Sequence, residues 1–403
     1  MEIKGLLGFR RSGQGGDNSI PVAPVTPRRR AVHLVLAALM GAAPLAAPAQ
    51  GVTKTTILVG QSGPLSGSNK EFGEDIRDGA NAYFKKINDA GGIHGRKIQL
   101  VTLDDANDAK KSGENGRILI EERGVVALFG YASATLSMPA LPFVEKHRVP
   151  FVAPFTGAEP MRKFNPLVYN VRVSYADELE KIVEFYTTTG MSKFAVLHYD
   201  DAVGKENLAA VQAALARRSL KPVSIGTVQR NQTALGDAVN GVLAAQPDVV
   251  IATTLYRTTA DFIKQARRNG SGAQFASTSF VGASALANEL KDQGTGVVVA
   301  QVVPPYSKQS VPIVKEYQTA IEKHLGKKDF SFTSLESYIS AKLLVEAIRR
   351  AGPKLTRESL IKALDSMQNY DAGGYVVDFN SKEHNGSKFV ELTAISKAGR
   401  FAY

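Results

Sequence analysis

The sequence predicts an α/β fold built from two doubly wound, mostly parallel sheets carried by one chain. Three observations lead to this prediction. Strand-like and helix-like segments alternate from residue 55 onward, the alternation begins again near residue 179, and a length of 403 residues suits two domains. Apolar residues make up 44% of the chain and charged residues 22%, so cores of ordinary size can form.

The first block begins with an apolar strand followed by an amphipathic helix. Five apolar residues recur at spacings of three and four, so they share one face of a helix that ends before Gly91-Gly92. They are Ile76, Ala80, Tyr83, Phe84 and Ile87. Strands are expected at 55–60, 97–105, 125–130 and 149–154, with a second helix at about 109–123.

The second block repeats the same alternation, and a mainly helical third follows it. In the second block, helices are expected at 179–190, 204–218, 235–245 and 258–269, and strands at 193–200, 221–229, 248–255, 274–281 and 296–304. The last third is expected to form helices at 334–351 and 356–367 before a strand-like tail at 389–396.

Two doubly wound blocks in one chain are expected to form a cleft. Ligands of open α/β sheets bind outside the carboxyl ends of the strands. The loops singled out by this rule are those after Val59, Leu103, Phe129, Val152, His198, Leu255 and Ser279.

Residues 28–49 have the layout of a secretory signal peptide. Three arginines precede a short apolar run, and Ala47-Pro48-Ala49 supplies small residues around a cleavage point. A membrane anchor is the alternative, but two prolines interrupt the run. Residues 1–27 are Gly-rich and polar, and form an extension of uncertain role. We therefore expect the mature chain in the periplasm.

Composition excludes several other classes of function. The chain has no cysteine, which removes disulfides, thiol nucleophiles and Cys-based metal sites. The formal net charge is +11, of which residues 1–49 supply +4, and the remaining charges are mixed in sign along the chain. Nucleic-acid binding needs a clustered basic patch, so we expect no nucleic-acid partner. After residue 50 no segment has 18 unbroken apolar residues, so no later membrane span is expected.

No common catalytic or cofactor motif is present. The glycines of GQSGPLSG, at 60–67, follow a strand but lack the G-x-G-x-x-G spacing of a dinucleotide site, and neither a P-loop nor a G-x-S-x-G elbow occurs. The six histidines form no H-x-x-x-H pair. We therefore predict no enzyme, no cofactor and no metal. A hydrolase that uses His198 is the remote alternative to a satisfied histidine at a sheet edge.

The opening segment SGPLSG, followed by FGEDIRDGANAYFKKINDAGGIHGRKIQLVTLDDANDA, resembles the first lobe of type I periplasmic solute-binding proteins. The most similar group is the leucine/isoleucine/valine-binding family of ABC transporters. The resemblance continues over about residues 53–400, through LFGYASATLSMPA, RVPFVAPFTGAEP, FAVLHYDDAVGKENL, DVVIATTLYRTTADFIKQAR and QFASTSFVGASAL.

This resemblance implies two lobes that close over a ligand by a hinge motion. Three crossovers are expected to join them, near 171–175, 303–306 and 380–389. Lobe 1 would comprise residues 53–172 plus 305–385, and lobe 2 residues 173–304 plus 386–403.

The resemblance also implies a set of ligand-binding residues. Hydroxyl and backbone N–H groups after the third and fourth strands would hold a ligand carboxylate, with helix capping as the alternative role of the hydroxyls. The segment Tyr131–Thr135 matches the first of these loops, and Ser133 or Thr135, together with Thr156, are the expected hydroxyl donors. Aromatic walls of the pocket are expected from Phe72, Phe155, Tyr175, Tyr256 and Phe280, with a plain core role as the alternative.

The sequence departs from the family at Ser279, where the family's amino-acid binders carry a glutamate that pairs with the ligand ammonium. Serine cannot supply that charge, and a buried ammonium without a counter-charge is costly. Asp104, Asp200 and Asp201 are the candidate substitutes. Val203 stands where the family has a tyrosine, and Arg257 would favour an anionic or aromatic acid if it faced the cleft.

The sequence therefore predicts a periplasmic substrate-binding component of an ABC importer. Its ligand would be a small carboxylate-bearing solute, either an amino acid, branched-chain or other, or an amine-free aromatic or keto acid. Its macromolecular partner would be a permease in the inner membrane, and a monomer is the default oligomeric state. The alternative is a ligand-sensing periplasmic receptor domain that feeds a signalling partner.

Overall fold

The computed structural model describes residues 51–232 and 234–402. The predicted extension at 1–27 and signal peptide at 28–49 lie outside these residues. The described chain forms two large sheets, one of five strands and one of seven, and a small two-stranded sheet. Neighbouring strands of the five-stranded sheet are parallel. In the seven-stranded sheet the pairs β10–β13 and β13–β14 are antiparallel, and the other pairs are parallel. The predicted α/β class with two mainly parallel sheets is confirmed.

The first sheet has the strand order β2-β1-β3-β4-β5. Its strands are β1 (Thr56–Gly63), β2 (Lys97–Asp104), β3 (Ala127–Phe129), β4 (Phe151–Val152) and β5 (Val168–Tyr169). The helices that connect them are α1 (Lys70–Asp89), α2 (Ala109–Arg117), α3 (Ala134–Ser137), α4 (Leu141–His147) and α5 (Glu159–Arg162). A π-helical turn at Ile118–Glu122 prolongs α2, so the predicted helix at 109–123 forms with an irregular last turn.

The second sheet has the order β14-β13-β10-β9-β8-β6-β7. Its strands are β6 (Phe194–Tyr199), β7 (Ser224–Val228), β8 (Val249–Ala252), β9 (Gln274–Ser277), β10 (Val298–Gln301), β13 (Glu391–Ile395) and β14 (Phe401–Ala402). Its helices are α6 (Tyr175–Thr188), α7 (Ala202–Ala216), α8 (Gly236–Leu243), α9 (Tyr256–Arg268) and α10 (Ala283–Leu290).

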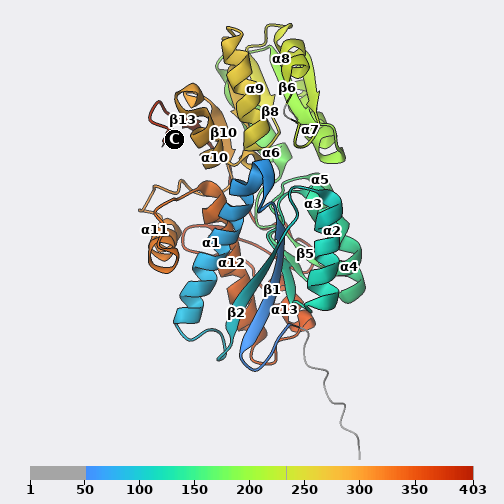
Figure 1. Ribbon diagram of the computed structural model, residues 1–403, viewed down its shortest axis with the longest axis vertical. Coiled ribbons are helices and arrows are strands. Elements are labelled where there is room, and N and C mark those ends of the chain that lie inside the picture. The colour runs from blue at the N-terminus through green and yellow to red at the C-terminus, as the bar shows by residue number, and fades with distance from the viewer. Residues whose placement is uncertain (1–50, 233, 403) are drawn as a thin grey trace, which may run out of the picture. The chain divides into compact units, whose positions relative to one another are not determined.

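The remaining elements belong with the first sheet. They are α11 (Pro312–Ala320), α12 (Phe332–Ala351), α13 (Arg357–Asp365), β11 (Tyr370–Asp371) and β12 (Val376–Val377). Helix α12 packs along α1, and the two helices lie on one side of β1 and β2 while α2 and α4 lie on the other (Figure 1). The long C-terminal helix is thus part of the core around the first sheet rather than a separate domain.

The chain passes between the two sheets three times. It leaves the first sheet after β5, returns after β10 and passes again to the second sheet before β13. The second and third passages make neighbours of elements that are far apart in the sequence. The lobe boundaries given above stay a prediction.

Two helices that the sequence pattern did not indicate are α10 and α11. Helix α10 follows Gly282, whose φ of 76° lies in the left-handed region, and α11 begins with Pro312, which suits the first helical position. Both are short, so their periodicity is too brief to be distinguished from a loop.

Candidate functional site

Four of the five predicted pocket aromatics are linked by ring contacts in the structure. Phe72 packs edge-on against Phe155 and Phe280, with ring centroids 6.5 and 5.9 Å apart. Tyr175 lies 6.0 Å from Phe280. Tyr256 joins them at Gly282, where an added Cβ would lie 3.1 Å from Phe72 Cδ2 and 3.9 Å from Tyr256 Cδ1. We call these five residues the aromatic cluster.

Local structure explains why these rings meet. Each of them lies in a loop or a first helical turn that follows the carboxyl end of a strand or a crossover. Phe72 is in the first turn of α1, Phe155 follows β4, Tyr175 begins α6, Tyr256 begins α9 and Phe280 follows β9. Parallel strands bring their carboxyl ends to one edge of a sheet, so the two sheets can present rings to each other there. All five side chains are at most 3% exposed.

A buried ion pair lies beside the aromatic cluster. Arg172, which follows β5, donates from Nε and Nη2 to the two carboxylate oxygens of Glu336 on α12, at 2.8 and 2.6 Å. Its guanidinium also lies 5.7 Å from the ring centroid of Phe155 and 6.0 Å from that of Tyr175. The third nitrogen, Nη1, is buried and has no hydrogen-bond partner in the described chain. An arginine so placed offers the two unused N–H groups of Nη1 next to the rings.

A second buried acid, Glu178 on α6, is held by Ser279. The backbone N–H and the hydroxyl of Ser279 donate to Glu178 Oε2 and Oε1, at 2.6 and 2.9 Å. Burial raises the pKa of Glu178 to about 7, although Arg172 and the Ser279 hydrogen bonds oppose the rise. Ser279 stands where no acid was expected, but it contacts one, because α6 contributes the carboxylate of Glu178.

Sequence reasoning missed Arg172, Glu178 and Glu336. One signal was present for Glu178, because it stands within the buried stripe of α6, on the same face as Leu179 and Ile182. A charged residue inside an apolar helical stripe needs a partner or a function. Arg172 and Glu336 are 164 positions apart in the chain, and no periodicity links them.

The predicted hydroxyl donors have internal roles. Ser133 caps α3 by accepting from the N–H of Leu136 at 3.3 Å, and its φ of 90° is unusual for a residue with a side chain. Thr156 Oγ1 accepts from the N–H of Ala158 at 3.1 Å. Both residues are buried, and both show the capping or turn role that was the alternative to ligand binding. Their ligand-binding role stays a prediction.

The side chains of Tyr131 and Arg257 make other contacts, although the Tyr131 carbonyl accepts from the N–H of Phe155 in the aromatic cluster at 2.8 Å. Tyr131 packs against Phe151, and its hydroxyl lies 3.7 Å from the Cβ that an alanine would place at Gly116 of α2. Arg257 forms a 2.8 Å ion pair with Glu289 of α10, and its side chain is 43% exposed. The role of Arg257 in ligand binding stays a prediction.

Thr135 lies in a polar contact between elements of the two sheets. Arg230, which follows β7, donates to Thr135 Oγ1 of α3 at 3.1 Å and to Asp201 Oδ2 at 2.8 Å. Thr135 in turn donates to Asp201 Oδ2 at 3.3 Å, and Asn107 Oδ1 accepts from Arg230 at 3.5 Å. We call Asn107, Thr135, Asp201 and Arg230 the interlobe clasp.

The three aspartates proposed as substitutes for a missing acid are engaged elsewhere. Asp104 accepts from the N–H groups of Leu65 and Ala106, at 2.8 and 2.9 Å, and so shapes the glycine-rich turn after β1. Asp200 forms an exposed pair with Lys205, and Asp201 caps α7 and belongs to the clasp. None of them supplies the acid beside the aromatic cluster, which is Glu178.

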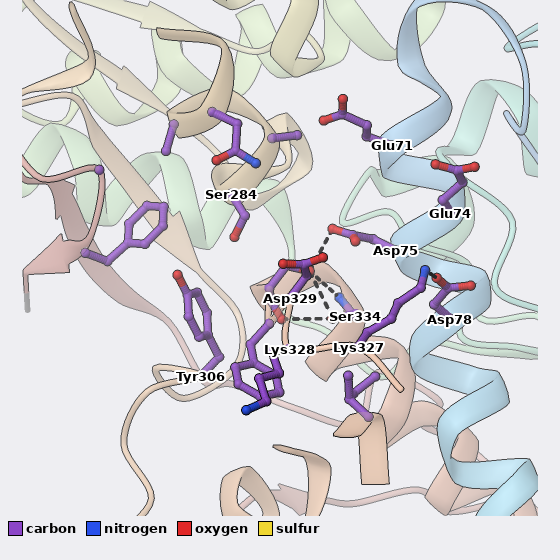
Figure 2. Close-up of a pocket in the computed structure, with 18 residues that line it drawn as sticks. Glu71, Glu74, Asp75, Asp78, Ser284, Tyr306, Lys327, Lys328, Asp329 and Ser334 are labelled. Atoms are coloured by element: carbon purple, nitrogen blue, oxygen red, sulfur yellow. Dashed lines mark hydrogen bonds and ion pairs between the residues drawn. The ribbon is translucent and has the colours of Figure 1, made fainter. Parts of the chain in front are cut away.

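A cavity of about 480 Å³ lies among α1, α10, α12 and the segment 327–331, and none of the predicted ligand residues lines it. Glu71, Glu74, Asp75 and Asp78 of α1 lie along one side (Figure 2). Asp75 accepts from Ser331 Oγ at 2.7 Å, and burial raises its pKa to about 7. The cavity wall is therefore strongly acidic.

The described residues hold no cluster of His, Cys, Asp and Glu side chains suited to a metal ion. None of their helices has the length and apolar character needed to span a bilayer. His198 is satisfied on both ring nitrogens, with Tyr199 O at 2.8 Å and Thr227 Oγ1 at 3.2 Å, and it lies near the end of β6, which pairs with both β7 and β8.

Two known proteins are similar to this chain over most of its length. The chain is 25% identical over 300 residues to the "Amino acid binding protein" of Pseudomonas aeruginosa, covering 73% of this chain and 79% of that protein. It is 25% identical over 371 residues to "Leu/Ile/Val-binding protein homolog 7" of Brucella melitensis, covering 87% and 90%.

Solved structures agree over the whole described chain. A substrate-binding periplasmic protein from Ralstonia solanacearum matches with 33% identity and a TM-score of 0.81, covering 86% of this chain and 99% of that one. A possible leucine/isoleucine/valine-binding protein from Rhodopirellula baltica matches with 29% identity and a TM-score of 0.82, covering 87% and 96%.

The sequence profile of the family described as "Periplasmic binding protein" matches residues 56–400. This span includes every strand of the two large sheets except β14, all three passages between the sheets and every residue of the aromatic cluster. The members of the family bind solutes rather than transform them, so the prediction that the chain is not an enzyme is confirmed. The chain belongs to the periplasmic binding protein family.

Proposed function

We propose that this protein is the substrate-binding component of an ABC importer and that it binds a small carboxylate-bearing solute at the aromatic cluster. It is exported to the periplasm by the segment 28–49, performs no chemistry, and delivers its solute to a permease in the inner membrane. Closing of the two lobes over the solute separates the loaded from the empty protein, because a ligand shifts a conformational equilibrium only through its differential affinity.

The observation that carries this proposal is the composition of the buried layer between the sheets. Elements of both sheets contribute rings to the aromatic cluster, and two oppositely charged residues, Arg172 and Glu178, lie beside those rings. Apolar walls with a few convergent polar groups are typical of small-molecule sites. The names of the Pseudomonas and Brucella relatives, which refer to amino acids, support the same class of solute.

A thermal-shift panel tests the proposal. The purified protein is freed of co-purified solute and heated with matched pairs of compounds: leucine with 4-methylpentanoate and 2-oxoisocaproate, and phenylalanine with 3-phenylpropanoate. A true ligand at 100 times its Kd stabilises the folded state by about 2.7 kcal/mol, which raises Tm by several degrees. Glucose and putrescine, which lack a carboxylate, serve as controls.

A rise in Tm with at least one carboxylate and with neither control supports the proposal. The proposal would be contradicted if none of the carboxylates raised Tm while glucose or putrescine did.

A further inference from the structure

We propose that the side chain of Asn88 keeps this protein from pairing with a second copy of itself along the edge strand β2. The surface concerned is the outer edge of the five-stranded sheet, which ends at β2. The partner that fits this edge is β2 of a second copy, running antiparallel to the first. This inference is independent of the solute and of the proposed function.

Strand β2 is the longest of the four outer strands of the two large sheets in the described chain. It has eight residues, whereas β7 has five and β5 and β14 have two each. It lies at the outside of the first sheet beside β1 (Figure 1). Its inner residues, Ile98–Leu103, include no charged residue, no proline and no glycine. Segments of this composition pair readily with other strands, so such an edge is expected to be protected.

The side chain of Asn88, in the last turn of α1, occupies one part of this edge. Its Nδ2 donates to the carbonyl oxygen of Ile98, and its Oδ1 accepts from the N–H of Ile98, both at 2.8 Å. These are the two bonds that a residue of a neighbouring antiparallel strand would make. Asn88 therefore takes the place of a partner strand at Ile98, which is only 3% exposed.

The rest of the outer edge is open. The N–H groups of Lys97 and Asp105 donate to carbonyl oxygens on the β1 side, so the main-chain groups of the even-numbered residues between them point outward. Ile98 is one of these residues, and Leu100 and Thr102 are the next two. The outward groups of Leu100 and Thr102 have no partner among the described residues, and both residues are only half-buried.

Charge favours an antiparallel copy of β2 as the partner. A pairing centred on Leu100 places each Ile98 opposite Thr102 of the other copy, and each Arg96 opposite Asp104. The basic start of one strand thus meets the acidic end of the other, whereas a parallel pairing would bring like charges together. The two copies are related by a twofold axis, so the contact uses both edges and ends at a dimer.

Asn88 prevents most of this contact. Ile98 takes part in two of the three central residue pairs, and its main-chain groups are already bonded to Asn88. The pair of Leu100 with its own copy is then the only one left between them. A single pair is too short a contact for a stable association of strands.

Sedimentation-velocity ultracentrifugation of the purified protein over a range of concentrations tests the proposal. Asn88→Ala removes both bonds to Ile98. Asn269→Ala is the matched control, since Asn269 caps the C-terminal end of α9 and its side chain bonds only to Asn240 of α8. A double variant, Asn88→Ala with Gln99→Lys, adds a charge at an exposed position of β2, which opposes strand pairing.

We expect the wild type and Asn269→Ala to sediment as monomers and Asn88→Ala to form a dimer. The association constant should rise roughly 10-fold or more, because two further residue pairs can form. Adding Gln99→Lys restores the monomer. Hydrogen exchange locates the contact: the amides of Leu100 and Thr102 exchange rapidly in the wild type and slowly in the Asn88→Ala dimer.

Asn88→Gln is the milder variant if Asn88→Ala does not fold. Its side chain is one methylene longer and cannot make both bonds to Ile98 with the same geometry. It should raise the association constant in the same direction but by less.

Three results would overturn the inference. The folded Asn88 variants could remain monomers at every concentration at which the wild type does. The Asn88→Ala protein could associate while the amides of Leu100 and Thr102 stay unprotected, or form open-ended aggregates in place of a dimer, which would place the contact elsewhere. The wild type could already pair along β2, in which case Asn88 does not prevent the contact. None of these results bears on solute binding, which the thermal-shift panel tests separately.

Discussion

At the scale of single residues, Ser279 shows that the effect of a substitution depends on the partner that the fold supplies. A serine at this position removes an acid from the loop after β9. Its N–H and hydroxyl then hold Glu178 of α6, which lies 101 positions earlier in the chain. The pocket therefore keeps a carboxylate next to the rings, although the carboxylate comes from a different element. Only the fold can reveal such a compensation.

Asp75, which is half-buried on the wall of the acidic cavity, is a second acid with a raised pKa. Its pKa is raised to about 7, first by burial and further by the neighbouring charges of Asp78 and Glu71, against the opposing effects of Ser331 and Lys327. The folded protein therefore holds a proton on Asp75 that the unfolded chain releases from about pH 4 upward. The free energy of unfolding falls as pH rises from about 4 to about 7, because the folded state binds more protons there.

We predict that Asp75→Asn reduces this loss of stability. Asparagine does not titrate, so the variant should lose on the order of 2 kcal/mol less than wild type between pH 5 and pH 8. Urea unfolding of the ligand-free protein at both pH values measures the difference. Asp237→Asn, which changes an exposed acid at the start of α8, is the control and should leave the pH dependence unchanged. Equal losses in wild type and Asp75→Asn would disprove the prediction.

At the scale of elements, the packing of α1 on α12 joins the C-terminal third to the first sheet. Gly79 lies at the contact, where a Cβ would come within 2.0 Å of the carbonyl oxygen of Ser334. Nearby, Ser337 Oγ donates to the carbonyl oxygen of Ile76 at 2.5 Å. The two helix backbones can approach this closely only because position 79 has no side chain.

We predict that Gly79→Ala destabilises the protein by about 3 kcal/mol, because the two helices must separate at a well-packed contact. Thermal or urea unfolding of the purified variant gives the value. Gly241→Ala in α8 is the matched control, since a Cβ there meets no atom within 4 Å. That substitution should be neutral or stabilising by up to about 1 kcal/mol, as expected for an exposed helical position. Equal effects of the two substitutions would show that the contact is not close-packed.

At the scale of the whole molecule, the interlobe clasp connects the two sheets without any contribution from a ligand. Arg230 and Asp201 come from the second sheet's side, and Thr135 and Asn107 from the first. The guanidinium of Arg230 also lies 4.6 Å from the ring centroid of Tyr199. These contacts require the lobes to be close together, so they stabilise the closed arrangement relative to an open one.

We predict that Arg230→Ala shifts the ligand-free protein toward an open form and lowers ligand affinity roughly 10-fold, because the closed state becomes less populated. Small-angle X-ray scattering should show a larger radius of gyration without ligand and an unchanged one at saturation. Arg217→Ala, which removes an ion pair with Glu180 within one lobe, is the control. An unaltered radius of gyration together with an unaltered affinity would rule out a role for the clasp in closure.

The sequence by itself determined the fold class and most of its elements. The apolar runs and the 3.6-residue periodicity placed β1, α1, β2 and α12 close to their observed bounds, because long periodic segments reflect burial directly. The strands and helices depend on neighbours in the chain, and local patterns record them. The rings of the aromatic cluster were expected from the resemblance to the solute-binding family.

Only the tertiary structure decided which polar groups meet. The pairing of Arg172 with Glu336, the contact of Ser279 with Glu178, and the use of Thr135 by Arg230 each join segments 95 to 164 residues apart. From the sequence alone, the same side chains would be interpreted as ordinary surface charges or helix caps. Their roles depend on burial and on the partner that the fold brings within hydrogen-bond distance, and neither quantity is encoded in local spacing.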